Sequence, residues 1–120
     1  TGIKLIVLGG VVRPNELTMH GHLTLWGAKQ LRAEKLFCGV EALSVNHGIT
    51  HGQLMEVSSD QALINSVTQI IILTDHTKFG KVSPAFIVSL EKIDTIVTGQ
   101  EADKEFIENL REREINVIQA

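Results

Sequence analysis

The sequence lacks the features of a disulfide-stabilised, membrane-spanning or secreted chain. Cys38 is the one cysteine among 120 residues, so an internal disulfide is excluded. No apolar run approaches the roughly 20 residues that cross a bilayer. No basic segment followed by an apolar stretch and a cleavage site marks a secretory leader. We therefore expect a cytoplasmic protein.

Clusters of positive charge are also missing. Lys and Arg number 11 against 14 Asp and Glu, which gives a formal net charge of −3. A nucleic-acid-binding face needs a concentration of Lys and Arg, so if the protein acts on DNA, another segment makes the contacts. The length fits one domain with its own core. The apolar stretch directly after Thr1 predicts a fragment of a longer polypeptide.

What the sequence does contain is an alternation of apolar strands and amphipathic helices. Residues 69–74 form the clearest strand, because they are apolar on both faces, as in a central parallel strand. Further strands are expected at 3–8, 35–43, 94–98 and 115–118, and helices at 22–33, 53–68 and 102–113. Loops are expected at 11–21 and 44–52, and residues 83–90 fit either a strand or a short helix.

This alternation predicts an α/β domain, with a parallel-rich sheet and helices on both faces. Ligands of such sheets bind beyond the carboxyl ends of the strands. The loops at that edge begin at Gly9-Gly10, Leu43, Asp75 and Gly99. Three of these loops combine glycine with polar or ionisable residues, a composition that can bring backbone N–H groups to an anion.

Asp75 and Lys78 follow the clearest strand and allow two interpretations. The ammonium of Lys78 could bind a phosphate or carboxylate, with Asp75 beside it. Alternatively, Asp75 caps backbone groups in a strand-end turn and Lys78 is solvated. The spacing alone favours the turn. A phosphoacceptor role for Asp75 would need a lysine from a different strand end, and Lys78 is too close in sequence.

Other ionisable residues give weaker signals. His47 and His51 could hold a metal ion, but metal sites need three or four ligands and no further ligand has a suitable spacing, so no metal is predicted. Cys38 lies within a predicted strand and fits a small core residue. Glu56 and Asp60 are four residues apart and share a helix face. Like charges in that pattern are typical of a solvated face.

Taken in order, these segments resemble the sensor domain of the DeoR family. The most specific is Leu73 to Gly80, which is similar to the family's Asp-Ser-Ser-Lys-Phe-Gly, and the second is Ile93 to Thr98. The other matching positions are Gly9-Gly10, Gly21, Phe37 to Val40, Gly48 to Thr50, Glu56 and Glu114 to Ile118. The resemblance therefore covers nearly the whole chain.

The resemblance implies a fold and a role. The family's sensor domain resembles ribose-5-phosphate isomerase and the coenzyme A transferase group, and the N-terminal part of that fold would precede Thr1. Members are mostly repressors of sugar and nucleoside catabolism that carry an N-terminal winged helix-turn-helix and respond to a phosphorylated sugar. Residues 1–120 would then be an effector-binding, homo-oligomeric domain that reaches DNA only through the absent N-terminal domain. The implied ligand-binding residues are Gly10, Glu41, Gly48, Thr50, Glu56, Asp75 and Lys78.

Three positions depart from the family pattern. Ser44 stands where the family segment ends in Gly-Ile-Asp, Asp60 where a lysine usually follows the glutamate, and Gly99 where an aspartate closes the strand. The family's Gly-Thr-Thr phosphate loop would precede Thr1. Losing a cation and gaining an anion weakens the binding of a dianion. Either the effector is less charged, or the segment before Thr1 supplies the anchor.

Two alternatives stand beside the sensor. A sugar-phosphate isomerase would keep acidic residues at the positions of Glu41, Ser44 and Glu56, and Ser44 breaks that set. Proton transfer also needs a base within hydrogen-bond reach and a group that polarises the carbonyl. We therefore predict no isomerase activity, no catalytic residue and no cofactor. The second alternative is an assembly domain with a degenerate pocket, whose symmetry would match palindromic operators.

Overall fold

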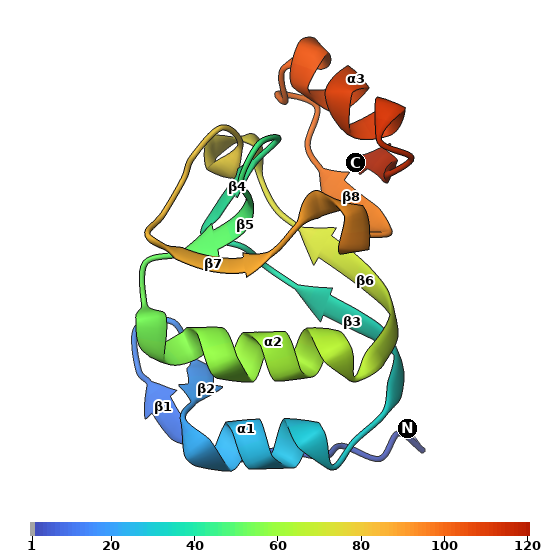
Figure 1. Ribbon diagram of the computed structural model, residues 1–120. Coiled ribbons are helices and arrows are strands. Elements are labelled where there is room, and N and C mark those ends of the chain that lie inside the picture. Colours follow the sequence, from blue (N-terminus) through green and yellow to red (C-terminus); the bar gives the residue numbers. More distant parts are fainter. Residues whose placement is uncertain (1) are drawn as a thin grey trace.

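A four-stranded parallel sheet forms the centre of the computed structural model, which describes residues 2–120 (Figure 1). Its strands are β3 (Ala33–Cys38), β6 (Val67–Leu73), β8 (Thr95–Thr98) and β9 (Asn116–Gln119), in the order β3-β6-β8-β9. Helix α2 (Val57–Asn65) precedes β6, and α3 (Lys104–Glu112) connects β8 to β9. The predicted α/β architecture, with a parallel-rich sheet and flanking helices, is confirmed.

Smaller elements surround this sheet. An antiparallel sheet has the order β4-β5-β7, with β4 at Ala42–Ser44, β5 at Gly48–His51 and β7 at Ala85–Val88. A hairpin of β1 (Val11–Arg13) and β2 (Thr18–His20) precedes helix α1 (His22–Lys29). Single 3-10 turns lie at η1 (Leu54–Glu56), η2 (His76–Lys78) and η3 (Leu90–Lys92). The Gly80 N–H donates to the Leu43 carbonyl at 2.8 Å, which ties the segment after η2 to β4.

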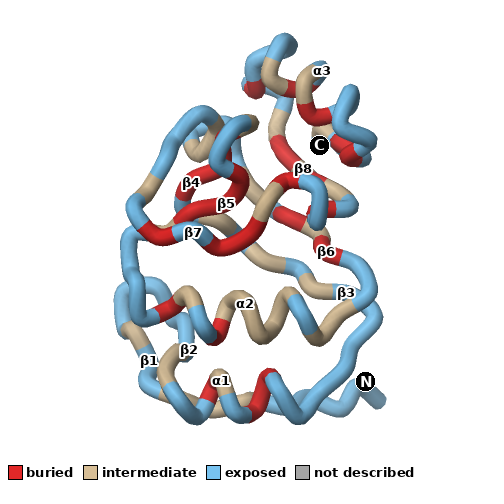
Figure 2. Tube along the Cα trace, in the orientation of Figure 1, coloured by how far each residue is buried: buried red, intermediate tan, exposed pale blue. Residues whose placement is uncertain are grey.

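The hydrophobic core lies on one face of the parallel sheet. Ile72, Ile96 and Val117 are register partners on adjacent strands and are all buried. Ile107 and Leu110 of α3 join the same cluster, and Figure 2 shows that burial is concentrated around the antiparallel sheet, β6, β8 and α3. Because each fully buried Leu or Ile side chain contributes about 1.5–3 kcal/mol, this cluster is the main source of the domain's stability.

The other face of the sheet is apolar but open to solvent. Leu73, Val97 and Ile118 are register partners there, and Leu73 and Ile118 are each 47% exposed. Phe37 on β3 is 60% exposed. The strands are therefore apolar on both faces, as the sequence indicated, although the described residues bury only one face deeply.

The strand predicted at residues 3–8 is wrong. These residues form no strand, and Ile3 and Leu5 are 82% and 84% exposed. Strand geometry is stabilised by hydrogen bonds to a neighbouring strand, and no strand of residues 2–120 pairs with this segment. The composition favours a strand, but composition alone supplies no partner.

The structure corrects the sequence prediction in three further segments and decides a fourth, ambiguous one. The loop expected at 11–21 contains the β1–β2 hairpin, whose turn is closed by Glu16 and Leu17 N–H groups donating to the Arg13 carbonyl. The single strand expected at 35–43 is two strands, β3 and β4, separated at Gly39. The loop expected at 44–52 includes β5, which pairs with β4, and the ambiguous segment 83–90 contains strand β7. In each case long-range pairing, which the local pattern does not encode, decided the outcome.

Gly48 tests how tightly the β4–β5 hairpin packs. Its φ is +67°, and a Cβ there would collide with the Val88 carbonyl oxygen; Gly80 has φ +80° but open space around it. A left-handed backbone costs alanine about 1–2 kcal/mol at either site, and overpacking adds about 1–3 kcal/mol at Gly48. We expect Gly48→Ala to lower the free energy of unfolding in urea clearly more than Gly80→Ala does. Equal losses would show that the hairpin can shift away from β7.

Candidate functional site

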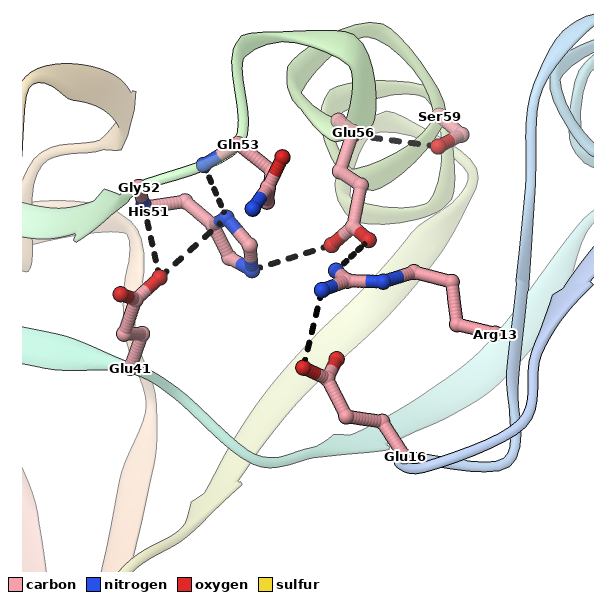
Figure 3. A network of polar contacts seen from close by, with 8 residues as sticks. All are labelled: Arg13, Glu16, Glu41, His51, Gly52, Gln53, Glu56 and Ser59. Carbon is pink, nitrogen blue, oxygen red and sulfur yellow. Dashed lines mark hydrogen bonds and ion pairs between the residues drawn. The ribbon is translucent and has the colours of Figure 1, made fainter.

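A network of charged side chains joins four segments that lie far apart in the sequence (Figure 3). We call Arg13, Glu16, Glu41, His51 and Glu56 the Arg13–His51 network. Arg13 ends β1, Glu41 follows β3, His51 ends β5, and Glu56 ends η1 directly before α2. The network therefore forms where the ends of several elements meet.

Glu56 is the centre of the network. Its side chain is 11% exposed, and its two carboxylate oxygens have different partners. Oε1 accepts a hydrogen bond from the Arg13 guanidinium, and Oε2 lies 3.0 Å from His51 Nε2. Arg13 also pairs with Glu16 at 2.9 Å. The hydrogen bond to Glu56 raises the pKa of Arg13 further above its ordinary value, because it favours the charged guanidinium.

The hydrogen bonds of His51 assign its tautomer. The Gln53 N–H donates to Nδ1 at 2.8 Å, so the ring proton belongs on Nε2, from which it is donated to Glu56. Glu41 Oε2 lies 3.3 Å from the same nitrogen, Nδ1, which carries no proton in this tautomer, so the hydrogen bond to Glu41 comes from the Gly52 N–H instead. Both ring nitrogens of His51 are thus occupied by groups of this protein.

Local backbone features hold Glu41 and Glu56 in place. The Gly52 N–H donates to Glu41 Oε2 at 2.6 Å. A Cβ at Gly52 would lie 2.9 Å from Glu41 Oε1, so a side chain there would displace this carboxylate. The hydroxyl of Ser59 donates to the Glu56 carbonyl at 3.1 Å, which secures the first turn leading into α2.

A small cavity opens beside the network, and we call it the β3–α2 cavity. Its volume is about 80 Å³. Glu41, Thr50, His51, Asp60 and Cys38 supply its polar or ionisable groups. Its remaining walls are mostly aliphatic, from Leu36, Val40, Ile49, Leu63, Ile64, Ile72 and Ile87. The cavity thus has an apolar interior and a carboxylate-rich edge, a composition typical of small-molecule sites.

Burial changes the acid–base properties of two cavity residues. Partial burial raises the pKa of Asp60, and the nearby Glu56 carboxylate raises it further, whereas His51 lowers it. Burial raises the pKa of the Cys38 thiol to about 11, with Asp60 adding to the effect. Cys38 is therefore a thiol rather than a thiolate at neutral pH, which fits the predicted role of a small core residue.

Three of the residues singled out from the sequence come together here. Glu41 and Thr50 both line the β3–α2 cavity, and Glu56 connects to Glu41 through His51. The Thr50 hydroxyl also accepts the Ser83 N–H at 2.8 Å. This part of the predicted site is compact, and its ligand role stays a prediction.

The two glycines singled out occupy packing positions. A Cβ at Gly10 would collide with the Thr24 hydroxyl, which itself donates to the Gly9 carbonyl at 2.6 Å. Gly48 is packed against Val88, and with Thr50 it also lines a wider depression of about 650 Å³. The structure thus gives each glycine a packing reason, and their ligand role stays a prediction.

Asp75 and Lys78 lie outside both the cavity and the network. Asp75 caps η2, accepting the Thr77 N–H at 2.8 Å and the Thr77 hydroxyl. These hydrogen bonds lower the pKa of Asp75 below its ordinary value. Lys78 is partly exposed and does not line the β3–α2 cavity. Asp75 therefore caps a turn at the end of the strand, as the second interpretation proposed. A ligand role for Asp75 or Lys78 stays a prediction.

Arg13, His51 and Asp60 belong to the site but have no sequence pattern that predicts this. His51 was considered only as a metal ligand with His47, whereas its neighbours are carboxylates and a backbone amide. Arg13 fell in a predicted loop, and no local pattern linked it to Glu56, 43 residues away. Residues 2–120 contain no group of three or more His, Cys, Asp or Glu side chains arranged to hold a metal ion, and no helix there is long and apolar enough to span a bilayer.

Glu56 and Glu91 provide a matched pair for testing the network. Each glutamate pairs with an arginine, but the Glu56 side chain is 11% exposed and the Glu91 side chain 67%. We expect Glu56→Gln to lower the free energy of unfolding by about 1–3 kcal/mol, because buried donors lose a charged partner. Glu91→Gln should change it by less than about 1 kcal/mol. Denaturant titrations of both variants measure this difference. If Glu56→Gln lowered the free energy of unfolding as little as Glu91→Gln does, the network would add no more stability than an exposed ion pair.

The pKa of Asp60 makes a signed prediction about pH. The pKa of Asp60 is raised in the folded state, so the unfolded state loses this proton at a lower pH. The free energy of unfolding therefore falls as the pH rises from the unfolded-state pKa of about 3.9 through the folded-state pKa. Asparagine has no such penalty. Relative to the wild type, Asp60→Asn should therefore gain stability between about pH 4 and pH 7. Thermal unfolding across this range measures the trend, and a relative loss with rising pH would reverse the assigned shift.

Several curated proteins are similar to this chain. The putative sgc region transcriptional regulator of Escherichia coli (strain K12) is 29% identical over 96 residues, which cover 80% of this chain and 37% of that protein. The HTH-type transcriptional regulator GolR of Listeria innocua is 28% identical over 102 residues, covering 85% and 40%. The putative aga operon transcriptional repressor of E. coli O157:H7 is 25% identical over 117 residues, covering 98% and 44%. The chain thus spans less than half the length of these relatives.

The family assignment rests on a match to a family profile that covers most of the chain. The sequence profile described as the DeoR C terminal sensor domain matches residues 1–100, which include β1 to β8 and the whole Arg13–His51 network. The three relatives are all named as regulators or repressors of transcription. On this evidence the chain belongs to the DeoR C-terminal sensor domain family.

Proposed function

We propose that this chain is the effector-sensing domain of a transcriptional regulator of sugar catabolism and that it binds a phosphorylated sugar or a related metabolite. The observation that carries the proposal is the β3–α2 cavity, which combines aliphatic walls with the ionisable groups Glu41, His51 and Asp60. Sugars present both C–H faces and hydroxyl groups, which suit such a lining. The names of some relatives point the same way, among them a glycerol-3-phosphate regulon repressor that is 23% identical over 95 residues.

The position of the cavity supports a sensing role. Glu41 and His51 line the cavity and also belong to the network that continues through Glu56 to Arg13 in the β1–β2 hairpin. A ligand that binds Glu41 or His51 competes with their contacts inside the network. Such differential contacts are what allow a ligand to shift a conformational equilibrium. Ligand binding in the cavity would therefore change how firmly the hairpin is held.

Contact with DNA and assembly belong to the proposal for the whole protein. The net charge of −3 and the absence of a basic cluster in the sequence make this chain a poor DNA-binding surface. We propose that a separate N-terminal domain binds the operator and that this domain contributes self-association. A symmetric oligomer would match a palindromic operator.

The test is a ligand screen on the full-length protein. A ligand that binds only the folded state stabilises it by about 2.7 kcal/mol at 100 times its Kd, so a sugar phosphate that is an effector should raise the Tm by a few degrees. Glu56→Gln, which weakens the network beside the cavity, should reduce this shift. Isomerase activity, measured as aldose–ketose interconversion in the same samples, would favour the enzyme alternative.

The predicted role of Lys78 has its own control. If its ammonium binds the phosphate, Lys78→Ala should abolish most of the Tm shift given by a sugar phosphate, because a single charge-assisted contact is worth about 1.5–3 kcal/mol. Lys81→Ala removes a nearby exposed lysine and should leave the shift unchanged. Equal effects of the two variants would remove Lys78 from the site. No shift with any sugar phosphate, together with intact self-association, would favour an assembly-only domain.

A further inference from the structure

We propose that the β3–α2 cavity takes a hydroxyl-bearing, unphosphorylated end of the effector and excludes phosphate, and that Asp60 sets this preference. The inference rests on the proposed sensing function and adds to it the chemistry of the group that enters the cavity and the residue that selects it.

The β3–α2 cavity has no cation available for a phosphate. Arg13 is the network's guanidinium, and it is already shared between Glu56 and Glu16. His51 offers no free nitrogen either, since Nε2 faces Glu56 and Nδ1 accepts the Gln53 amide. No Lys or Arg lines the cavity. An entering dianion would therefore meet carboxylates without a free positive charge to compensate it.

The Asp60 carboxylate has oxygen atoms that are free to accept hydrogen bonds. It lines the cavity, and within residues 2–120 its side chain makes no hydrogen bond or ion pair. Its partial burial, which raises its pKa, shows that water solvates it incompletely. A carboxylate in this situation gains from hydroxyl donors and is opposed by a second anion. Glu41, on the exposed edge of the same cavity, can accept a second hydroxyl.

The small volume of the cavity limits how much of a ligand can enter it. A volume of about 80 Å³ corresponds to between two and three water molecules at roughly 30 Å³ each. That space holds one end of a sugar rather than a whole hexose. Gly39 and Glu41 are exposed, so the rest of the ligand would leave the cavity along the segment that joins β3 to β4. A phosphate carried by the effector would then lie outside, away from Asp60.

Ligand contact at the Thr50 hydroxyl would complete the recognition. Its oxygen accepts the Ser83 N–H, which leaves its own proton free to be donated. A sugar hydroxyl could accept this proton and donate its own to Asp60. The aliphatic walls around them would contact the C–H groups between hydroxyls. Phosphate oxygens cannot donate to Asp60 when fully ionised, so the same pattern does not fit them.

The experiment measures the sign of the affinity change caused by Asp60→Asn. The full-length protein is titrated with paired probes, D-glucose with D-glucose 6-phosphate and glycerol with glycerol 3-phosphate, followed by further hexoses with their 6-phosphates. Asparagine keeps the shape of the side chain but removes its charge. If a hydroxyl-bearing end sits at Asp60, the Kd of each bound compound should rise about tenfold, because a charge-assisted hydrogen bond becomes a neutral one.

Two variants serve as controls. Glu108→Gln removes a carboxylate on the exposed side of α3 and should leave every Kd unchanged. Asp60→Glu keeps the carboxylate and should bind the same compounds within a few-fold of the wild type, which guards against a merely unfolded Asp60→Asn sample. Unchanged or tighter binding of the phosphorylated probes by Asp60→Asn would overturn the inference while leaving the sensing function intact. Failure of the wild type to bind any sugar or sugar phosphate would overturn both.

Discussion

The carboxylate of Glu56 is the contact on which the candidate site depends. It joins Arg13 of the first hairpin to His51 at the end of β5, and Glu41 beyond β3 lies next to the His51 ring, where it accepts the Gly52 N–H. Among residues 2–120, Glu56 is also the one charged residue that the fold buries. A buried carboxylate is tolerated only when it is paired and hydrogen-bonded, so the ends of these elements must meet for Glu56 to be accommodated. The geometry of the cavity edge follows from that requirement.

Stability and sensing are served by different parts of the chain. The apolar cluster of the sheet, β7 and α3 is deeply buried and contains no ionisable side chain. The hairpin and α1 are far less buried, as Figure 2 shows, and Arg13 ties that hairpin to the rest through charged contacts. Ion pairs near the surface are weaker than core packing and respond to pH and to competing ligands. This division lets the site change its contacts without unfolding the sheet.

How much could be predicted from sequence depended on the range of the interactions. Strand β6 and helix α3 were predicted to within two residues at each end, because their apolar periodicity is local and strong. The failures at residues 3–8 and 11–21 arose because strands require partners, and pairing is a long-range property. The site behaves in the same way. Glu41, Thr50 and Glu56 came from the family resemblance, whereas the link from Arg13 to Glu56 crosses 43 positions and has no local signature.

Asp60 shows why the charge of a site cannot be inferred from helix periodicity. Its position four residues after Glu56 suggested a solvated acidic face, yet the fold turns both residues inward, one into the network and the other toward the cavity. Partial burial raises the pKa of Asp60, and the nearby Glu56 carboxylate adds to this effect. Arg13 and His51 Nε2 pair with Glu56, and within residues 2–120 the Asp60 side chain makes no hydrogen bond or ion pair of its own. The contacts that hold Glu56 thus leave the Asp60 carboxylate without a partner of its own. A ligand that entered the cavity would meet this unpaired carboxylate.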